Sequence, residues 1–423
     1  MIVLAVDADQ PVPALNQMSL LPLYAAAGTA VLVLVMELLT GRRAAVIGSL
    51  VLGGVATAVC AIVTTGGRPA TFCSAASGSC SWVPSPTAVV AAVLFAALTV
   101  GVAALSTPML RLGVAPAGEF CFLLACSMTG GVVVGYAGDL ICLIVGLETL
   151  TLPLYVLVGL RRFAPREPVT TTGASASVTF FVISVVSTAI ALLGIALNYA
   201  ATGGLHLDKL TDGLGPTEPV ATAGVALIVI GLAFKVAAVP LHAWAPSTYD
   251  GAPLPVAAYL STASKLGGVI ALAAIVVRLD AAAVTATLAV LTMTIGNLVA
   301  LRQTRMVRLL AWSSVAQAGY ILAPLALGAA GAGAAVAYAV FFVVLEFIAF
   351  GVVVPCAPRA PTAARSSTTA GPAAVRRGWV PRWCWPWPGW PVCHPGWPAC
   401  SPRSPSSTCW SIGTGAGWPP WSP

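Results

Sequence analysis

Long apolar stretches separated by short polar loops fill the chain from residue 21 to residue 354. Each stretch is close to the ~20 residues that an α-helix needs to cross a bilayer. The pattern predicts an all-α polytopic membrane protein, with a helical bundle over residues 1–354 and long loops only at 66–86 and 201–219. Eleven transmembrane helices are predicted, near residues 21–39, 44–65, 87–105, 117–136, 138–160, 173–200, 221–245, 254–278, 281–301, 308–327 and 331–354.

The composition agrees with a membrane protein and gives no sign of a nucleic-acid partner. Hydrophobic residues make up 58% of the 423 residues and charged residues only 8%, with a mean hydropathy of +0.94. A soluble domain carries roughly a quarter charged residues. The first 20 residues contain Asp7 and Asp9 but no Lys or Arg. A cleaved secretory signal has a basic start, so we predict that the first apolar helix is retained.

The charges of the loops predict the orientation, because cytoplasmic loops carry an excess of Lys and Arg. Alternate loops hold nine arginines, against three basic residues on the opposite side. This places the first set in the cytoplasm and the N-terminus outside. The first set is Arg42, Arg43, Arg111, Arg161, Arg162, Arg166, Arg302, Arg305 and Arg308, and the second is Arg68, Lys209 and Arg278. Cys73 and Cys80 then share an outside loop, where a disulfide and two free thiols are both open interpretations.

Seven ionisable residues fall within or near the predicted helices. Such groups are costly inside a bilayer, so they usually face the bundle interior or water and serve ion pathways. Glu119 and Asp139 lie nearer helix ends, and we expect them to be interfacial. The candidates for charges inside the membrane are Glu37, Glu148, Lys235, Lys265 and Glu346.

Glu148 and Lys235 are predicted to form a proton-transfer pair. Each is central in its stretch, LICLIVGLETLTLPLYVLVGL and VALIVIGLAFKVAAVPLHAW. Pro240 lacks a backbone donor and clashes with the preceding turn, so we expect a helix break near Lys235 that frees carbonyls and admits water, as in transporters. Burial weakens the hold of a lysine on its proton and a nearby carboxylate strengthens it. Moving the carboxylate, or its proton, would therefore switch Lys235.

Lys265 would be the next residue in the proton path after Lys235. It lies in PVAAYLSTASKLGGVIAL, after Ser and Thr residues that can hydrogen-bond in lipid. The alternative is a static ion pair that only fixes helix register, which leaves this second lysine unexplained. His242 is a candidate proton relay, with a helix-end hydrogen bond as the competing interpretation. For Glu37 and Glu346 a structural role is the favoured interpretation.

Three strings resemble subunit N of the proton-pumping NADH-quinone oxidoreductase, respiratory complex I. They are FKVAAVPLHAWAPSTYDGAPLPVAAYLSTASKLG at 234–267, LRQTRMVRLLAWSSVAQAGYIL at 301–322 and GLETLTLPLYVL at 146–157. YDGAP at 249–253 and TASK at 262–265 favour subunit N over its antiporter-like sister subunits and over sodium/proton antiporter subunits. The resemblance covers about residues 20–354.

The resemblance implies a fourteen-helix antiporter-like fold with two inverted five-helix repeats, and proton translocation driven by distant quinone reduction. It assigns Glu148, Lys235 and Lys265 to the proton path. It implies a multi-pass protein of the bacterial inner membrane, whose partners are the lipid bilayer and other membrane subunits of complex I. NAD, FMN, iron–sulfur clusters and quinone are expected in other subunits, with no cofactor or metal site here. A cation/proton antiporter subunit and a non-pumping structural subunit are the alternatives.

The composition changes abruptly at 355–423, which holds nine of the twelve Trp, fifteen Pro and six Arg, but no Asp, Glu or Lys. The family pattern has a second broken helix there, with Pro-Pro and then Lys. Without it the second repeat is truncated, and we expect an unstructured tail and an exposed inner face on the helix at 331–354, including the region around Glu346. A genuine Trp-rich tail at the membrane interface is the alternative, because Trp is favoured there.

A shifted reading frame explains the tail better. Trp is encoded by TGG and Pro by CCN, so a Trp-Pro pair read one base earlier gives Leu, Val or Met followed by Ala. Residues 383–403, read from the last base before Trp383, allow an apolar helix, then Pro-Pro, then a position that can be Lys. This is the motif that the tail replaces, so we infer a frameshift between about residues 351 and 383.

Resequencing the gene tests this inference. A one-base insertion or deletion upstream of Trp383 should restore the Pro-Pro and Lys helix, followed by further apolar blocks. The tail is genuine if the sequence is confirmed and the shifted frame soon meets a stop codon.

Overall fold

The computed structural model describes residues 15–65, 70–74, 78–160, 169–210, 219–279 and 281–356, without the side chains of 169–172 and 355–356. Several predictions concern residues outside these ranges. They are the acidic N-terminal segment, Arg68, the arginines of 161–168, and the tail from residue 357 onward.

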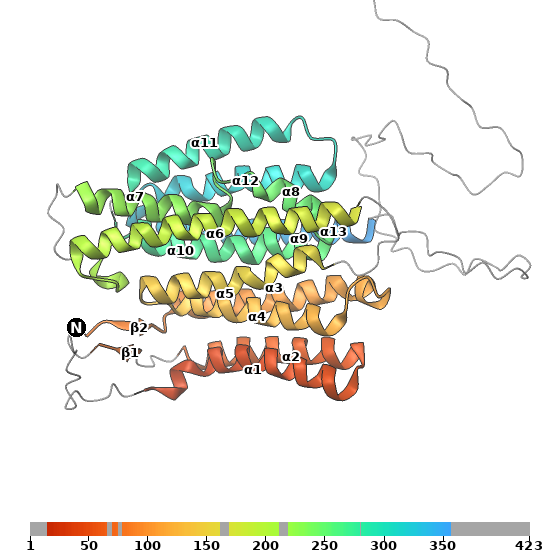
Figure 1. Cartoon of the computed structure of the whole chain (residues 1–423). Helices are drawn as coiled ribbons and strands as arrows, with labels where there is room; N and C mark the ends of the chain where they lie inside the picture. Colours follow the sequence, from red (N-terminus) through yellow and green to blue (C-terminus); the bar gives the residue numbers. More distant parts are fainter. Residues whose placement is uncertain are drawn as a thin grey trace, which may run out of the picture. The chain divides into compact units, whose positions relative to one another are not determined.

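The described chain is a bundle of helices that lie side by side (Figure 1). Ten helical segments are long and apolar enough to cross a membrane within the described residues. The predicted helix at 308–327, α12, is also present but is more polar. The long helices are α1 (Leu21–Thr40), α2 (Arg43–Val63), α3 (Pro86–Arg111), α4 (Ala117–Tyr136), α5 (Leu140–Gly159), α6 (Val169–Thr202), α7 (Pro219–Ala233), α11 (Ala282–Ala300), α12 (Met306–Leu325) and α13 (Ala329–Cys356).

The predicted helix at 221–245 is not continuous. Helix α7 ends at Ala233 and passes into the 3₁₀ turn η3 (Phe234–Val236), and α8 (Trp244–Gly251) starts only at Trp244. Ala237 has a left-handed φ of 59°, and Pro240 has no N–H to continue the ladder. The predicted break near Lys235 is therefore confirmed, while the continuous bounds are wrong.

The central helix is also interrupted. The predicted helix at 254–278 consists of α9 (Leu254–Tyr259), the π-helical turn η4 (Leu260–Ser264) and α10 (Lys265–Val276). In this segment 83% of the spanning window is buried, against 28% in α11 and in α13. A π-turn widens the helix by one residue and is frequent at functional sites. It ends immediately before Lys265.

The predicted loop at 66–86 contains a small hairpin. Strands β1 (Thr71–Cys73) and β2 (Cys80–Trp82) pair antiparallel, and a disulfide joins Cys73 to Cys80. Of the two interpretations left open by the sequence, the structure shows the disulfide. The backbone of this hairpin region is tied to the end of α4, since Val83 N donates to Tyr136 O at 2.9 Å.

Contacts between loops define two ends of the bundle. At one end the Arg43 guanidinium donates to the backbone oxygen of Arg111 at 3.0 Å. At the other end Trp82 Nε1 donates to Ser19 O at 3.0 Å, so the hairpin lies at the start of α1. Because α1 has 20 residues and rises about 1.5 Å per residue, these ends are about 30 Å apart. The arginine-containing loops and the hairpin thus lie on opposite sides.

Candidate functional site

Glu148 of α5 and Lys235 of η3 form an ion pair inside the bundle. Lys235 Nζ lies 2.8 Å from Glu148 Oε1, and the side chains are 3% and 28% exposed. The predicted proximity of these two residues is confirmed. Lys235 Nζ also donates to Thr151 Oγ1 and to Ser184 Oγ, both at 3.2 Å. The ammonium therefore has three oxygen partners from two neighbouring helices, α5 and α6.

Hydroxyl groups extend this pair into a network that the sequence reasoning missed. Thr188 Oγ1 donates to Glu148 Oε1 at 2.6 Å, and the Tyr155 hydroxyl donates to Ser184 Oγ at 2.5 Å. A signal was available, because Thr151 and Tyr155 follow Glu148 at helical spacings of three and seven and so share its face. Nothing in the sequence of α6 pointed to Ser184 and Thr188.

The helix break holds Lys235 in place because side chains satisfy its free backbone groups. Trp244 Nε1 donates to Phe234 O at 3.2 Å. Across the break, Val239 N donates at 3.0 Å to Thr292 Oγ1 of α11. Buried backbone groups left without partners are costly, so these bonds stabilise an irregular segment that would otherwise be unfavourable in a membrane.

Among the described residues, Lys265 is the most deeply buried charged residue, at 1% exposed. Its Nζ donates to Ser314 O at 2.5 Å and lies 5.8 Å from the centre of the Phe342 ring. No carboxylate of the described residues comes within ion-pair distance of it. Helix α10 passes close to the break, since a Cβ on Gly268 would lie 2.8 Å from Lys235 Cβ. The two lysines thus sit on contacting segments.

His242 lies apart from the lysine pair. Its ring is half-buried, with Nδ1 3.2 Å from Pro240 O and its centroid 5.3 Å from that of Trp312. The Pro240 contact is the local hydrogen bond that the competing interpretation proposed. A relay role stays a prediction.

The expectation of an exposed face around Glu346 is wrong. Glu346 is only 4% exposed. Helix α13 turns this face toward α9, η4 and α10, and presents Phe341, Leu345 and Ile348 outward instead. The carboxylate thus lies on a face that packs against helices of the described bundle.

The other acidic residues lie at or near helix ends. Asp139 caps α5, accepting a hydrogen bond from Cys142 N at 2.6 Å, and Glu119 is exposed in the first turn of α4. The predicted end positions of both are confirmed. Glu37 is half-buried, and a Cβ on Gly118 at the start of α4 would lie 2.6 Å from its carboxyl carbon.

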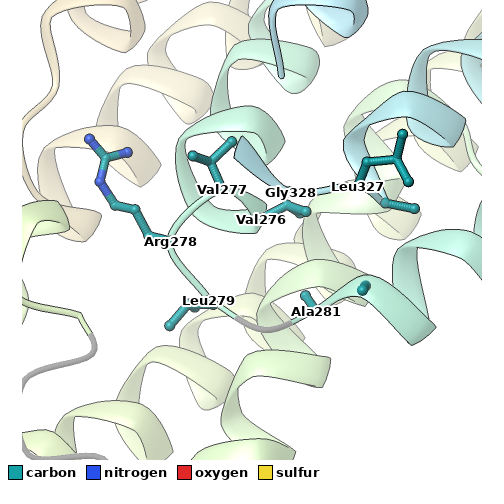
Figure 2. A pocket seen from close by; sticks show the side chains of 9 residues that line it. Val276, Val277, Arg278, Leu279, Ala281, Leu327 and Gly328 are labelled. Atoms are coloured by element: carbon teal, nitrogen blue, oxygen red, sulfur yellow. The ribbon is translucent and has the colours of Figure 1, made fainter. Parts of the chain in front are cut away.

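No group of three His, Cys, Asp or Glu residues among those described could hold a metal ion. A cavity of about 320 Å³ lies where the end of α10, the start of α11 and the end of α12 meet. Figure 2 shows that the side chain of Arg278, the charged residue of its lining, points away from Leu327 and Ala281. The lining of the cavity contains none of the proton-site residues.

Comparisons with known proteins agree with this arrangement. Residues 137–366 match the family described as NADH:quinone oxidoreductase/Mrp antiporter, transmembrane. The NADH-quinone oxidoreductase subunit N of Salinispora tropica is 56% identical over 390 residues, which cover 87% of this chain and 74% of that protein. A chain of respiratory complex I from Thermus thermophilus, solved with bound aureothin, is similar with a TM-score of 0.64 and 27% identity, covering 79% of this chain and 70% of its own.

A chain of the Mrp complex from Dietzia has the same fold, with a TM-score of 0.64 at 23% identity over 80% of this chain and 65% of that one. The matched family segment contains Glu148, Lys235, Lys265 and Glu346. The chain therefore belongs to the subunit N family of NADH-quinone oxidoreductases, within the wider family of antiporter-like membrane subunits.

Proposed function

We propose that this chain is a membrane-arm subunit of an NADH-quinone oxidoreductase that translocates protons across the membrane. The observation that carries the proposal is the buried Glu148–Lys235 pair at a helix break, next to a second buried lysine that has no carboxylate partner within ion-pair distance among the described residues. A subunit that only holds neighbours together needs neither the break nor Lys265.

The pair acts as an electrostatic switch. At an effective dielectric constant of about 20, moving the Glu148 carboxylate from 2.8 Å to about 6 Å from Nζ removes about 3 kcal/mol of attraction. This weakens the hold of Lys235 on its proton about a hundredfold. The released proton has hydroxyl neighbours at Thr151 and Ser184, and hydroxyls both accept and donate protons. Lys265 is the acceptor further along the path.

The energy comes from elsewhere in the complex. The names of the relatives support a role in quinone reduction by NADH, and we assign NAD, FMN, iron–sulfur clusters and quinone to other subunits of the assembled enzyme. The outward faces of α1, α11 and α13 are apolar and suit lipid or neighbouring membrane subunits. Exposed apolar residues on these faces include Leu38, Leu39, Leu298, Phe341 and Ile348.

The test measures two quantities in liposomes that contain the assembled complex. One is the rate of NADH oxidation and the other is the proton gradient formed, for the native subunit and for Lys235→Ala. The antiporter alternative gains support if proton movement requires a sodium gradient instead of NADH oxidation.

The arginine-containing end of the bundle is proposed to face the cytoplasm of a bacterial cell. Two arguments support this: the distribution of loop arginines, and the disulfide at the opposite end, since disulfides persist in oxidising compartments outside the cytoplasm.

A cysteine probe placed in the loop at 161–168 should be labelled from the cytoplasm, and one placed at 203–215 from outside. Labelling with membrane-impermeant thiol reagents, in whole cells and in inverted vesicles, distinguishes the two sides. The reverse pattern would overturn the orientation.

A further inference from the structure

Three residues on one face of α13 lie between two buried polar groups, Lys265 and Tyr249. Phe342, Glu346 and Phe350 are spaced four residues apart, so they stack along one side of the helix. The ring of Phe342 lies under Lys265 Nζ, 5.8 Å from it. The ring of Phe350 meets the ring of Tyr249 edge to face, at 6.4 Å between centroids. Along the axis of α13, Glu346 thus lies about one helical turn, roughly 6 Å, from Phe342, which contacts Lys265, and the same distance from Phe350, which contacts Tyr249.

The polar atoms around Glu346 are buried and poorly paired. Glu346 Oε2, the Tyr249 hydroxyl and Ser314 Oγ make no hydrogen bond of normal geometry within the described ranges, although Ser261 lies beside Glu346 and Ser314 beside Tyr249. The carboxylate is nevertheless close enough to interact electrostatically with Lys265 and with Tyr249. A buried polar group without a partner costs about 1–3 kcal/mol, so three together indicate bridging water or a functional role.

This cluster has an end near the protein surface. Tyr249 precedes Asp250 in α8, and Asp250 forms an ion pair with Arg305 at 2.6 Å. Arg305 is 65% exposed. The same end of the bundle holds the start of α6, because a Cβ on Gly173 would lie 3.3 Å from Gly251 O. Polar groups are thus present at intervals between an exposed charge and the deeply buried Lys265, with gaps that bridging water would have to fill.

A static counter-charge does not explain the geometry. If Glu346 served only to neutralise Lys265, direct contact would be the most stable arrangement in a low dielectric. Lys265 Nζ instead binds the backbone oxygen of Ser314. The π-turn η4 also faces α13 beside the carboxylate, and such turns locally rearrange helix hydrogen bonds. The separation leaves room for a proton to be exchanged through a bridging group.

We propose that Tyr249 and Glu346 form a proton-entry branch, bridged by water, that connects the Asp250–Arg305 surface to Lys265. The carboxylate of Glu346 accepts a proton from the Tyr249 hydroxyl or from water and becomes neutral. It then passes that proton to the neutral amine of Lys265 and regains its charge. Tyr249 regains its proton from the surface side, so neither residue changes overall. This branch rests on the proposed proton translocation and adds a route that does not pass through Glu148.

The test uses the assembled complex in liposomes, with protons moved per NADH oxidised as the readout. Glu346→Gln keeps the size and polarity of the side chain but cannot carry a proton, and Tyr249→Phe keeps the ring packing against Phe350. Both should lower the ratio to the level of Lys235→Ala, and Glu346→Asp should restore most of it. Tyr338→Phe is the matched control, because that hydroxyl lies on α13 but bonds to Gln317. It should leave the ratio unchanged.

Infrared difference spectroscopy gives a second readout. A protonated carboxyl band that shifts in D₂O and is lost in Glu346→Gln would show that Glu346 takes up a proton and contacts water. If Lys235→Ala lowers pumping while Glu346→Gln and Tyr249→Phe do not, the branch is wrong and the proposed function stands. If none of the three lowers pumping, both are wrong. Should Glu346→Gln fail to assemble, Tyr249→Phe decides alone.

Discussion

Replacing Lys235 by alanine should abolish proton translocation through this subunit while the complex still inserts into the membrane. The substitution removes the amine that Glu148, Thr151 and Ser184 hold, so the pair loses the group that takes up and releases the proton. We expect the protons attributable to this subunit to fall at least about tenfold, the effect of roughly 1.4 kcal/mol on a barrier. Glu148 is partly exposed, so it can be solvated and folding should survive.

Two further variants separate a switch from a static pair. Lys235→Arg retains a positive charge and an ion pair but cannot release its proton, so pumping should also be lost. Lys209→Ala is a control at a lysine outside the predicted helices and should pump normally. Normal pumping by Lys235→Arg would support a purely structural pair. Normal pumping by Lys235→Ala would refute the proposed function.

Replacing Gly130 by leucine should prevent the native packing of α4 on α5. A Cβ at Gly130 would lie 2.1 Å from Leu150 N, which is backbone and cannot rotate away. Gly146 on the opposing helix is also restricted, because a Cβ there would lie 2.9 Å from Val134 N. Overpacking in a core typically costs about 1–3 kcal/mol, occasionally more, and here two backbones must separate. Because α5 carries Glu148, the ion pair would be displaced as well.

The measurement is the amount of assembled complex and its thermal unfolding temperature. Gly28→Ala on α1 is the matched control, because a Cβ there meets nothing within 4 Å. It should be neutral or slightly stabilising, since alanine favours a helix by about 0.8–1.0 kcal/mol over glycine. An unchanged unfolding temperature for Gly130→Leu would contradict the close approach of the two helices.

The predictions that succeeded from the sequence rest on residue types that are rare in membrane-spanning helices. Glu148 and Lys235 are charges where apolar residues are expected, and Pro240 lacks the backbone N–H that would continue a helix. Their pairing and the break could therefore be predicted from the residue pattern alone. The positions of Glu119 and Asp139 followed from the limits of the apolar stretches.

Other features have no such signature. Helix α13 is apolar on all sides apart from Glu346, so periodicity cannot indicate which face is buried. The exposure of Glu346 was predicted from the missing helices of the second repeat, and it was wrong because α9, η4 and α10 lie against this face. The π-turn η4 depends on packing against α13, and the short hairpin β1–β2 depends on contacts with α4. Ser184 and Thr188 are residue types that are common in membrane helices. Only the packing of α6 against α5 shows that they contact the Glu148–Lys235 pair.

The hydrogen bond from Val239 to Thr292 has a mechanical consequence. The irregular segment between η3 and α8 is anchored to α11, so it is not a free hinge. Any displacement that moves Lys235 substantially must either break this anchor or pull α11 with it. A rearrangement at the ion pair would then be transmitted as a physical movement of a helix in the other half of the bundle, in addition to any transfer of charge.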